Sequence, residues 1–430
     1  MQTGYPSRRQ WGWQLLLAAA LLLAFWLGLP ATKPAPSLVP PASDTLPLKG
    51  HWQFNFASDA DTTLVHAASM VTLPDGRLRG FWFAGSREGA ADVSINSSVF
   101  DPSTGKWTDE EPVLTREQLM QQWGRYVRKL GNMVPVLDAD GSLRLFVVAV
   151  SFGGWAASRI VVLRSTDEGA HWHFETELKT SPFLNISTLV KAPPVHYDDG
   201  SIGLPVYHEM ATKFGELLRL DSNNRILAMS RIGHGRKAIQ PLLLVAGSER
   251  VAAFLRPETE PHDGVIDQSM SLDAGRDWTH LKATGLATPS SALGGVALTA
   301  THWLLVGNCN RFERDDLCVR ETLDGGKSWH KRWTLHDRDK WRDHPLDFSD
   351  FSKLLDESMA TDTSIDEPKV LQHARHNKCE GGNECEFQFD YPYMLRSANG
   401  DLHILYTWNK TMIRHAWFRL DKNVEVASGS

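Results

Sequence analysis

Three carboxylates, Glu88, Asp92 and Glu209, stand beside predicted β-strands, where their side chains can be directed into a shared pocket. Two carboxyl groups that face one pocket support general acid and general base catalysis, the chemistry that cleaves glycosidic bonds. Each group also has an ordinary structural role. Asp92 can cap a turn before a strand, and Glu88 can form a salt bridge with Arg87. The residue types therefore indicate acid–base chemistry without deciding which carboxylates carry it.

All four cysteines lie late in the chain, at Cys309, Cys318, Cys379 and Cys385. An even number at short spacings predicts two local disulfides, which form in an oxidising compartment. A zinc site is the alternative, but neither the spacing nor the neighbouring residues match a ligand knuckle. The sequence therefore predicts disulfides, and neither a metal site nor a cofactor.

Short alternating strands separated by turn residues must position these side chains. Asp-Gly pairs recur before or inside the strands, and Asn399-Gly400 serves the same purpose. Convincing helical periodicity is scarce. The strands predicted from this pattern are Val71–Phe83, Leu143–Val150, Ile160–Arg164, Ile202–Tyr207, Leu242–Leu255, Trp303–Val306 and Leu402–Trp408. We therefore expect an all-β meander.

One turn pattern, Ser/Thr-x-Asp-x-Gly-x-x-Trp, occurs three times, and a worn copy runs from Asp101 through Gly105 to Trp107. In each copy the Asp side chain can accept hydrogen bonds from backbone N–H groups, the Gly can adopt positive φ, and the Trp can pack over the turn. These roles are structural. The three copies contain Asp167, Gly169 and Trp172; Asp273, Gly275 and Trp278; and Asp324, Gly326 and Trp329.

The copies recur with a period that is typical of propeller blades. Asp273 and Asp324 lie 51 residues apart, and Asp167 and Asp273 lie 106 apart. The longer interval equals about two steps of the shorter one, so a silent copy is expected near Asp221. Residues 49–425 have room for six such units with insertions. The sequence therefore predicts a six-bladed β-propeller.

The N-terminus predicts export of this domain. Arg8 and Arg9 precede an uninterrupted apolar run, residues 11–30, which is long enough to span a bilayer as a helix. The basic segment, residues 1–10, should stay in the cytoplasm. A transmembrane anchor is favoured over a cleaved signal peptide because no small-x-small cleavage site ends the run. Prolines in residues 31–48 predict a semi-extended linker. We therefore expect a domain on the periplasmic or extracellular side that is anchored to the membrane or, as the alternative, secreted.

The composition excludes one class of partner. A formal net charge of -6 leaves no basic footprint for nucleic acid. Hydrophobic residues make up 42% of the chain and charged residues 22%, which is typical of a globular protein. The 16 tryptophans suit either a repeat that uses them structurally or a platform for sugars.

Residues 337–378 lack the strand pattern and are predicted to be an insertion, with a short helix around Phe351–Met359. A loop of this length is unusual inside a compact domain. It can be a lid, a partner surface or a solvated insertion. Its mixed His and Asp content has no convincing ligand spacing for a metal.

The repeated turn is similar to the Asp-box, or BNR repeat, of the sialidase (neuraminidase) superfamily, and the chain resembles the bacterial predicted-neuraminidase group within it. In that superfamily three arginines grip the substrate carboxylate, a tyrosine assisted by a glutamate is the nucleophile, and an aspartate is the acid/base. Guanidinium groups match a planar carboxylate, and a neutral phenol suits an anionic sugar better than a carboxylate would. The resemblance spans nearly the whole domain and includes Phe81–Gly89 with Asp92–Ile95, Ile239–Pro241 with Phe254–Arg256, Pro289–Ser291, and Tyr391–Pro392 with Leu402–Trp408.

The resemblance implies roles for four residues. Asp92 corresponds to the acid/base and Tyr391 to the nucleophile, while Arg256 and Arg314 correspond to two of the three arginines. Glu88 is a competing catalytic carboxylate. The ordinary alternatives are a buried, hydrogen-bonded tyrosine at 391 and solvated or paired arginines at the other two positions.

Two positions depart from the superfamily pattern. The first arginine should fall near residue 66, where this chain has His66, and the glutamate falls near Gln240. A protonated histidine can still pair with an anion, although a satisfied core histidine is the alternative. A glutamine removes the obvious base for the tyrosine. The residues expected to bind substrate are Arg87, Arg256, Arg314, His66, Gln240 and Glu209.

We therefore expect an exo-acting, sialidase-like glycoside hydrolase that acts on an anionic sugar outside the cytoplasm. A glycan-binding propeller without catalytic activity is one alternative, motivated by the two departures. A polysaccharide lyase is another, in which His66 or Tyr391 abstracts a proton. The expected partners are a carbohydrate and, through the N-terminal helix, a membrane.

Overall fold

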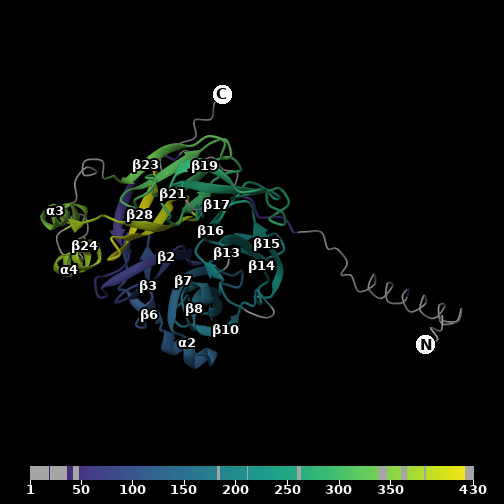
Figure 1. Ribbon diagram of the computed structural model, residues 1–430, viewed down its shortest axis with the longest axis horizontal. Helices are drawn as coiled ribbons and strands as arrows, with labels where there is room; N and C mark the ends of the chain where they lie inside the picture. The colour runs from purple at the N-terminus through teal and green to yellow at the C-terminus, as the bar shows by residue number, and fades with distance from the viewer. Residues whose placement is uncertain are drawn as a thin grey trace, which may run out of the picture. The chain divides into compact units, whose positions relative to one another are not determined.

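The computed structural model describes residue 19 and residues 36–41, 48–181, 185–210, 212–258, 263–337, 346–359, 366–381 and 384–421 (Figure 1). Ser37–Ser430 form one compact unit. The expected segments 1–10 and 11–30 lie outside the described residues, except for Ala19, and so does most of the linker at 31–48. In the described part of the chain, no helix combines the length and apolarity needed to cross a bilayer.

Six antiparallel sheets of four or five strands form within these residues, which confirms the predicted six-bladed propeller (Figure 1). Blade 1 comprises β2 (Leu64–Thr72), β3 (Leu78–Gly85), β4 (Ser94–Asp101), β5 (Lys106–Trp107) and β6 (Glu111–Leu114). Blade 2 comprises β7 (Lys129–Leu137), β8 (Leu143–Val150), β9 (Ser158–Ser165) and β10 (His173–Glu177). Blade 3 comprises β11 (Leu189–Val190), β12 (Val195–His196), β13 (Ile202–His208), β14 (Phe214–Leu220) and β15 (Ile226–Ile232).

The remaining blades follow the same order along the chain. Blade 4 comprises β16 (Ala238–Val245), β17 (Val251–Pro257), β18 (Val265–Ser271) and β19 (Lys282–Ala287). Blade 5 comprises β20 (Gly294–Ala297), β21 (Trp303–Gly307), β22 (Leu317–Thr322) and β23 (His330–His336). Blade 6 comprises β26 (Phe389–Arg396), β27 (Leu402–Trp408), β28 (Met412–Leu420) and β1 (Gly50–Phe56).

The ring is closed by the first strand of the domain, which completes the last blade. Strand β1 pairs antiparallel with β28, from Gly50 opposite Leu420 to Phe56 opposite Arg414. This pairing covers a sheet edge that would otherwise be exposed. The first strands of neighbouring blades meet at the hub, where β2 contacts β7 and β26, and β20 contacts β16 and β26.

Burial falls from the inner strands to the outer ones, which explains the sequence pattern. Every residue of β8 and of β16 is buried, and both strands are apolar apart from Arg144 in β8 and Gln240 in β16. The outermost strand of blade 3, β15, exposes Leu227, Ala228 and Met229. Two predicted strands proved to be pairs of strands joined by a turn. The range Val71–Phe83 covers parts of β2 and β3, and Leu242–Leu255 covers parts of β16 and β17.

The repeated turns join the third and fourth strands of blades 2, 4 and 5, at the outer side of each sheet. In blade 2, Asp167 Oδ1 accepts from Ser165 Oγ at 2.7 Å and from His171 N at 3.0 Å. Gly169 adopts a φ of 92°, and Trp172 Nε1 donates to Gly169 O at 2.9 Å. The turns at Asp273 and Asp324 repeat the Asp contacts. Asp101 and Asp221 also cap turns, as expected of degenerate copies.

Two helices were not predicted from the sequence, one between blades 1 and 2 and the second helix of the insertion. Helix α2 (Arg116–Trp123) connects blades 1 and 2 and begins with a capping box between Thr115 and Gln118. In the insertion, α3 (Phe348–Met359) matches the expected helix closely, and α4 (Glu367–Lys378) follows it. The hairpin β24 (Cys379–Glu380) and β25 (Glu384–Cys385) ends this segment.

The insertion is packed rather than solvated. Phe351 and Leu355 of α3 and Val370 and Ala374 of α4 are buried in one cluster with residues of blades 5 and 6. Figure 1 shows α3, α4 and β24 together at one side of the propeller. The structure pairs Cys379 with Cys385 within the hairpin, and Cys309 with Cys318 in blade 5.

Candidate active site

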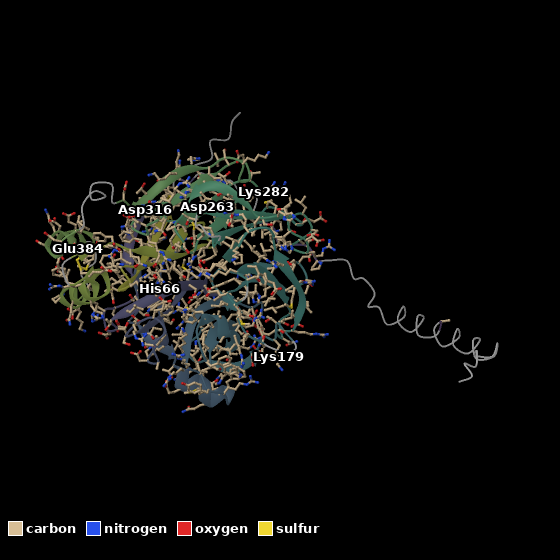
Figure 2. All side chains as sticks on the ribbon, in the orientation of Figure 1. His66, Lys179, Asp263, Lys282, Asp316 and Glu384 are labelled. Atoms are coloured by element: carbon tan, nitrogen blue, oxygen red, sulfur yellow. A yellow bond between two sulfur atoms is a disulfide. The ribbon has the colours of Figure 1, made fainter. Side chains whose placement is uncertain are left out.

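A polar cavity of about 340 Å³ lies among the inner strands of the propeller. Its lining comes from β2, β7, β11, β13, β17, β26 and neighbouring loops, so residues far apart in sequence meet there. Figure 2 places His66, one of these residues, near the middle of the propeller. The lining includes six residues predicted from the sequence, His66, Glu88, Glu209, Arg256, Arg314 and Tyr391, and five others, Asn132, Trp155, Leu189, Tyr207 and Lys410.

Bulges in the inner strands direct side chains into this cavity. The register of β2 shifts between His66 and Ser69, that of β16 between Ile239 and Leu242, and that of β26 between Asp390 and Tyr393. At these shifts Ala67, Gln240 and Tyr391 have positive φ values of 60°, 52° and 54°. Positive φ is unfavourable for residues other than glycine, and such strain clusters at functional sites. The bulges therefore mark the hub as the candidate site.

Tyr391 is held by two hydrogen-bond donors. Its Oη lies 3.1 Å from Gln240 Nε2 and 3.1 Å from Arg256 Nη1. Arg256 Nη1 also donates to Gln240 Oε1 at 3.3 Å, and because an arginine only donates, this contact sets the orientation of the amide. The guanidinium carbon of Arg314 lies 6.0 Å from the centre of the Tyr391 ring. The Tyr391 oxygen therefore accepts hydrogen bonds from two different side chains.

Each arginine of the cavity has a carboxylate partner. Arg256 Nη2 lies 3.1 Å from Glu258 Oε1, and Arg314 Nη1 donates to Asp390 Oδ2 at 2.8 Å. Burial opposes the charge of Arg256, but Tyr391 and Glu258 outweigh it and raise the pKa of Arg256. A guanidinium has five N–H donors, and among the described residues Arg314 gives only two, to Asp390 and to the carbonyl of Ser290. Donors therefore remain for a ligand anion.

His66 is a neutral residue of the cavity near pH 7. It is 3% exposed, and burial lowers its pKa to about 4, although Asp390 opposes the shift. Its Nδ1 lies 2.8 Å from Thr407 Oγ1 and 3.5 Å from Asp390 Oδ1, and its ring centre lies 4.3 Å from that of Tyr391. Burial therefore disfavours the protonated form of His66 that would pair with an anion in place of the missing arginine.

Glu88 and Glu209, and not Asp92, are the predicted carboxylates that line the cavity. Both oxygens of Asp92 accept from Ser86, from its N and its Oγ at 3.0 Å each. Asp92 thus caps the loop after β3, which is the structural role that the sequence left open. Arg87, in the same loop, is exposed and is not part of the lining in the described chain.

The two lining carboxylates have opposite pKa shifts. Burial raises the pKa of Glu209, and the positive charges of Lys213 and Arg256 oppose this rise without cancelling it. Burial also disfavours ionisation of Glu88, but nearby positive charge, including that of Lys410, outweighs it and lowers the pKa of Glu88. Lys410 Nζ lies 3.2 Å from Glu88 Oε2, so the expected salt bridge of Glu88 with Arg87 is replaced by one with Lys410. Carboxylates whose environments separate their pKa values are suited to acid and base roles.

Sequence reasoning missed two lysines at this site. Lys410 lines the cavity from the turn between β27 and β28. Lys191 is 2% exposed, donates to Ala68 O at 3.2 Å, and lies 5.8 Å from the centre of the Tyr391 ring. Burial lowers the pKa of Lys191 to about 7. A single charge inside the apolar segment Leu189–Ala192 was the available signal for Lys191. Nothing in the local sequence marked Lys410.

No group of three or more His, Cys, Asp or Glu side chains in the described chain has the arrangement of a metal site.

Comparison with known proteins identifies the family. Residues 76–404 match the family model of the BNR repeat-like domain. No curated protein matches the chain. The fold is similar to that of the Hadza microbial sialidase Hz136, with a TM-score of 0.63 and 13% identity over 85% of this chain and 68% of that chain.

Two further solved structures share the fold. NanB sialidase from Streptococcus pneumoniae has a TM-score of 0.57 and 10% identity over 92% of this chain and 72% of that chain. The α-L-arabinanase of Penicillium chrysogenum has a TM-score of 0.53 and 11% identity over 85% of this chain and 97% of that chain. Identities this low show the fold alone. Because the family model matches more than half of the chain, the chain belongs to the BNR repeat-like domain family.

Proposed function

We propose that this protein is a glycoside hydrolase that cleaves the bond between an anionic sugar and its leaving group in the cavity at the hub. The observation that carries the proposal is the environment of Tyr391, whose Oη accepts hydrogen bonds from Gln240 and Arg256 beside two lining carboxylates. The hydrolases among proteins of similar fold are consistent with it.

The anionic group of the sugar would lie against Arg256, Arg314 and Lys410. All three line the cavity, and guanidinium groups bind carboxylates in a defined orientation. Because His66 is neutral, the cavity has less positive charge than it would have with a third arginine at this position. We therefore propose a sugar with a single anionic group rather than a polyanion.

In the proposed reaction Tyr391 Oη attacks the anomeric carbon while the glycosidic bond breaks. Glu209, whose raised pKa favours the protonated form, donates its proton to the departing oxygen. Glu88, the ionised carboxylate, takes the phenolic proton of Tyr391 directly or through a water. Water then cleaves the glycosyl–tyrosine bond, giving its proton to the Glu209 carboxylate, and Tyr391 regains its proton from Glu88.

Sugar binding without turnover is the second candidate function, and Gln240 favours it. This amide contacts Tyr391 directly at the position where a proton acceptor would be most effective, and an amide cannot accept the phenolic proton. The hydrolase proposal depends on Glu88 to supply that acceptor.

One experiment separates these functions. The domain comprising residues 49–430 is incubated with fluorogenic sialosides, uronides and neutral glycosides, and with uronate polysaccharides. Release of the fluorophore together with a sugar product that contains no new double bond supports hydrolysis. Absorbance of a new double bond would instead identify a lyase, and saturable binding by calorimetry without any product would identify a binding protein. Cleavage of neutral glycosides alone would contradict the role of the arginines.

We also propose that the domain works outside the cytoplasm, as expected from the N-terminal segment. The Cys309–Cys318 and Cys379–Cys385 disulfides support this, because such bonds persist in oxidising compartments. Alkylation of the protein in intact cells, before and after reduction, tests the proposal. Four thiols that react without reduction would contradict it.

A further inference from the structure

The last turn of α4 contacts the turn that carries Lys410. Asn377 Nδ2 donates to Thr63 O at 2.7 Å, and it lies 3.3 Å from both Lys410 O and Thr411 Oγ1. A residue of the insertion therefore ties together the start of β2 and the turn between β27 and β28.

That turn needs external support. Asn409 and Lys410 have positive φ values of 52° and 54°, and two consecutive residues other than glycine in this region are strained. Hydrogen bonds from Asn377 and from Val65 N, at 3.1 Å, converge on the carbonyl of Lys410. Asn409 Oδ1 accepts from Gln388 N at 2.8 Å. These contacts hold the backbone of the turn from which the Lys410 side chain reaches the cavity.

Lys378, the next residue of α4, is linked through hydrogen bonds to Arg314, the second cation of the cavity. Lys378 Nζ donates to Gln388 Oε1 at 2.7 Å. Gln388 Nε2 in turn donates to Asp390 Oδ2, the oxygen that accepts from Arg314 Nη1 at 2.8 Å. Because Lys378 holds the amide oxygen of Gln388, the amide nitrogen faces Asp390. A continuous hydrogen-bond chain thus runs from α4 to Arg314.

The end of α4 is itself held firmly. Val370 and Ala374 are fully buried in the cluster shared with blades 5 and 6. The Cys379–Cys385 disulfide follows the helix at once, and Glu386 N donates to Lys378 O at 3.0 Å. This end of the helix is therefore a rigid support rather than a lid.

We propose that Asn377 and Lys378, at the end of α4, are positioning residues that orient Lys410 and Arg314 for binding the anionic group of the sugar. The inference rests on the proposed function and extends it, since it makes the insertion an integral part of the anion site. Neither residue touches the ligand, and both act through the cations that do.

Replacement of Lys378 by Met tests the chain to Arg314, and replacement of Asn377 by Ala tests the contact with Lys410. The matched control is Lys369→Met, which removes another lysine of α4 whose ion pairs with Asp61 and Asp366 are exposed. Lys378→Arg should restore the wild-type behaviour because it keeps a donor for Gln388. Thermal unfolding of each variant confirms that the propeller is folded.

Two readouts are used. With a fluorogenic sialoside and a fluorogenic uronide as probes, KM should rise about tenfold in Lys378→Met and Asn377→Ala, the equivalent of ~1.4 kcal/mol, while kcat changes less than about twofold. Amide hydrogen exchange of residues 388–391 and 409–411 should accelerate in the same variants and not in Lys369→Met.

The outcomes are distinct. Unchanged KM and unchanged exchange overturn the inference, and so does faster exchange with unchanged KM, because the ordering would then not serve the anion. If the wild-type protein neither cleaves nor binds either probe, the proposed function fails. In that case no KM can be measured, and exchange that is faster in the Asn377 and Lys378 variants but not in Lys369→Met would still support α4 as the element that orders the two cations.

Discussion

Tyr391 Oη lies 3.1 Å from Gln240 Nε2, so the tyrosine at the hub contacts an amide that can donate to it but cannot take its proton. Gln240 and Arg256 both donate to the Tyr391 oxygen, and neither side chain can act as a base for the phenol. This one contact separates the hydrolase proposal from the binding alternative.

Gln240→Glu should therefore increase hydrolysis, because a carboxylate at this position can accept the phenolic proton. We expect kcat to rise by roughly tenfold or more, at the lower end of what a positioned base contributes. The measurement is kcat on the best glycoside of the assay, with Gln240→Leu as the control for loss of the hydrogen bond. A Glu variant no faster than the Leu variant would argue against proton transfer from Tyr391.

Tyr391→Phe should remove hydrolysis, with kcat falling by roughly 10²- to 10⁴-fold, the usual effect of losing a catalytic group. Binding of the sugar should persist because the arginines remain. Tyr393→Phe, a buried tyrosine of the same strand, is the matched control and should retain activity. Undiminished turnover in Tyr391→Phe would exclude the tyrosine as nucleophile and favour a mechanism that uses Glu88 and Glu209 alone.

Glu209→Gln should show a strong dependence on the leaving group. A good leaving group needs little protonation, so an aryl glycoside should lose less than about tenfold in kcat/KM, while an alkyl-linked disaccharide should lose roughly 10²- to 10⁴-fold. The pH profile should also lose its alkaline limb, because activity that needs protonated Glu209 declines as pH rises through its raised pKa. Asp92→Asn should change neither property, since Asp92 caps a loop. An equal loss for both substrates would assign the proton donor elsewhere.

The propeller should lose stability below pH 6.5. Burial lowers the pKa of His66 to about 4 and that of His403 to about 3, and it also lowers the pKa values of His336 and His415. Above pH 6.5 neither the folded nor the unfolded chain protonates these rings. As the pH falls below 6.5 only the unfolded chain binds protons, which costs on the order of 3 kcal/mol for His66 by pH 4.

Glu110 has the opposite effect on stability. Burial raises its pKa to about 7, so as the pH falls the folded chain binds a proton at Glu110 before the unfolded chain does. Asp267, whose pKa burial raises to about 6, acts in the same direction as Glu110. The free energy of unfolding, measured in denaturant at pH 7, 6, 5 and 4.5, should still decline overall, because the four buried histidines together outweigh these carboxyl groups. His403→Gln should show a smaller decline. A free energy of unfolding that stays constant from pH 7 to 4.5 would contradict this prediction.

Asp167→Ala should lower stability and leave catalysis intact. The side chain accepts from His171 N and Ser165 Oγ in a rim turn, and loss of these bonds should cost about 1–2 kcal/mol. The denaturation midpoint and kcat/KM of the variant are compared with those of the wild type. A large loss of kcat/KM with unchanged stability would show that the repeated turns contribute to the site.

The sequence determined the fold because its signals are local. Each repeated turn needs only its own Asp, Gly and Trp, so Asp167, Asp273 and Asp324 indicate blade corners wherever the rest of the chain lies. The resemblance also indicated Arg256, Arg314 and Tyr391, which the structure brings into one cavity. Glu88 and Glu209 were recognised as candidates from residue type alone.

Only the tertiary structure decided which of these groups meet and in what charge state. Whether Asp92 or Glu88 enters the cavity depends on how one loop closes, and the charge of His66 depends on its burial against Thr407, Asp390 and Tyr391 of blade 6. The roles of Lys191, Lys410 and α4 arise from contacts between segments hundreds of residues apart, such as Asn377 with Thr63. Local pattern cannot encode these properties, because desolvation and the direction of a side chain at a bulge are set by the packing of the closed ring.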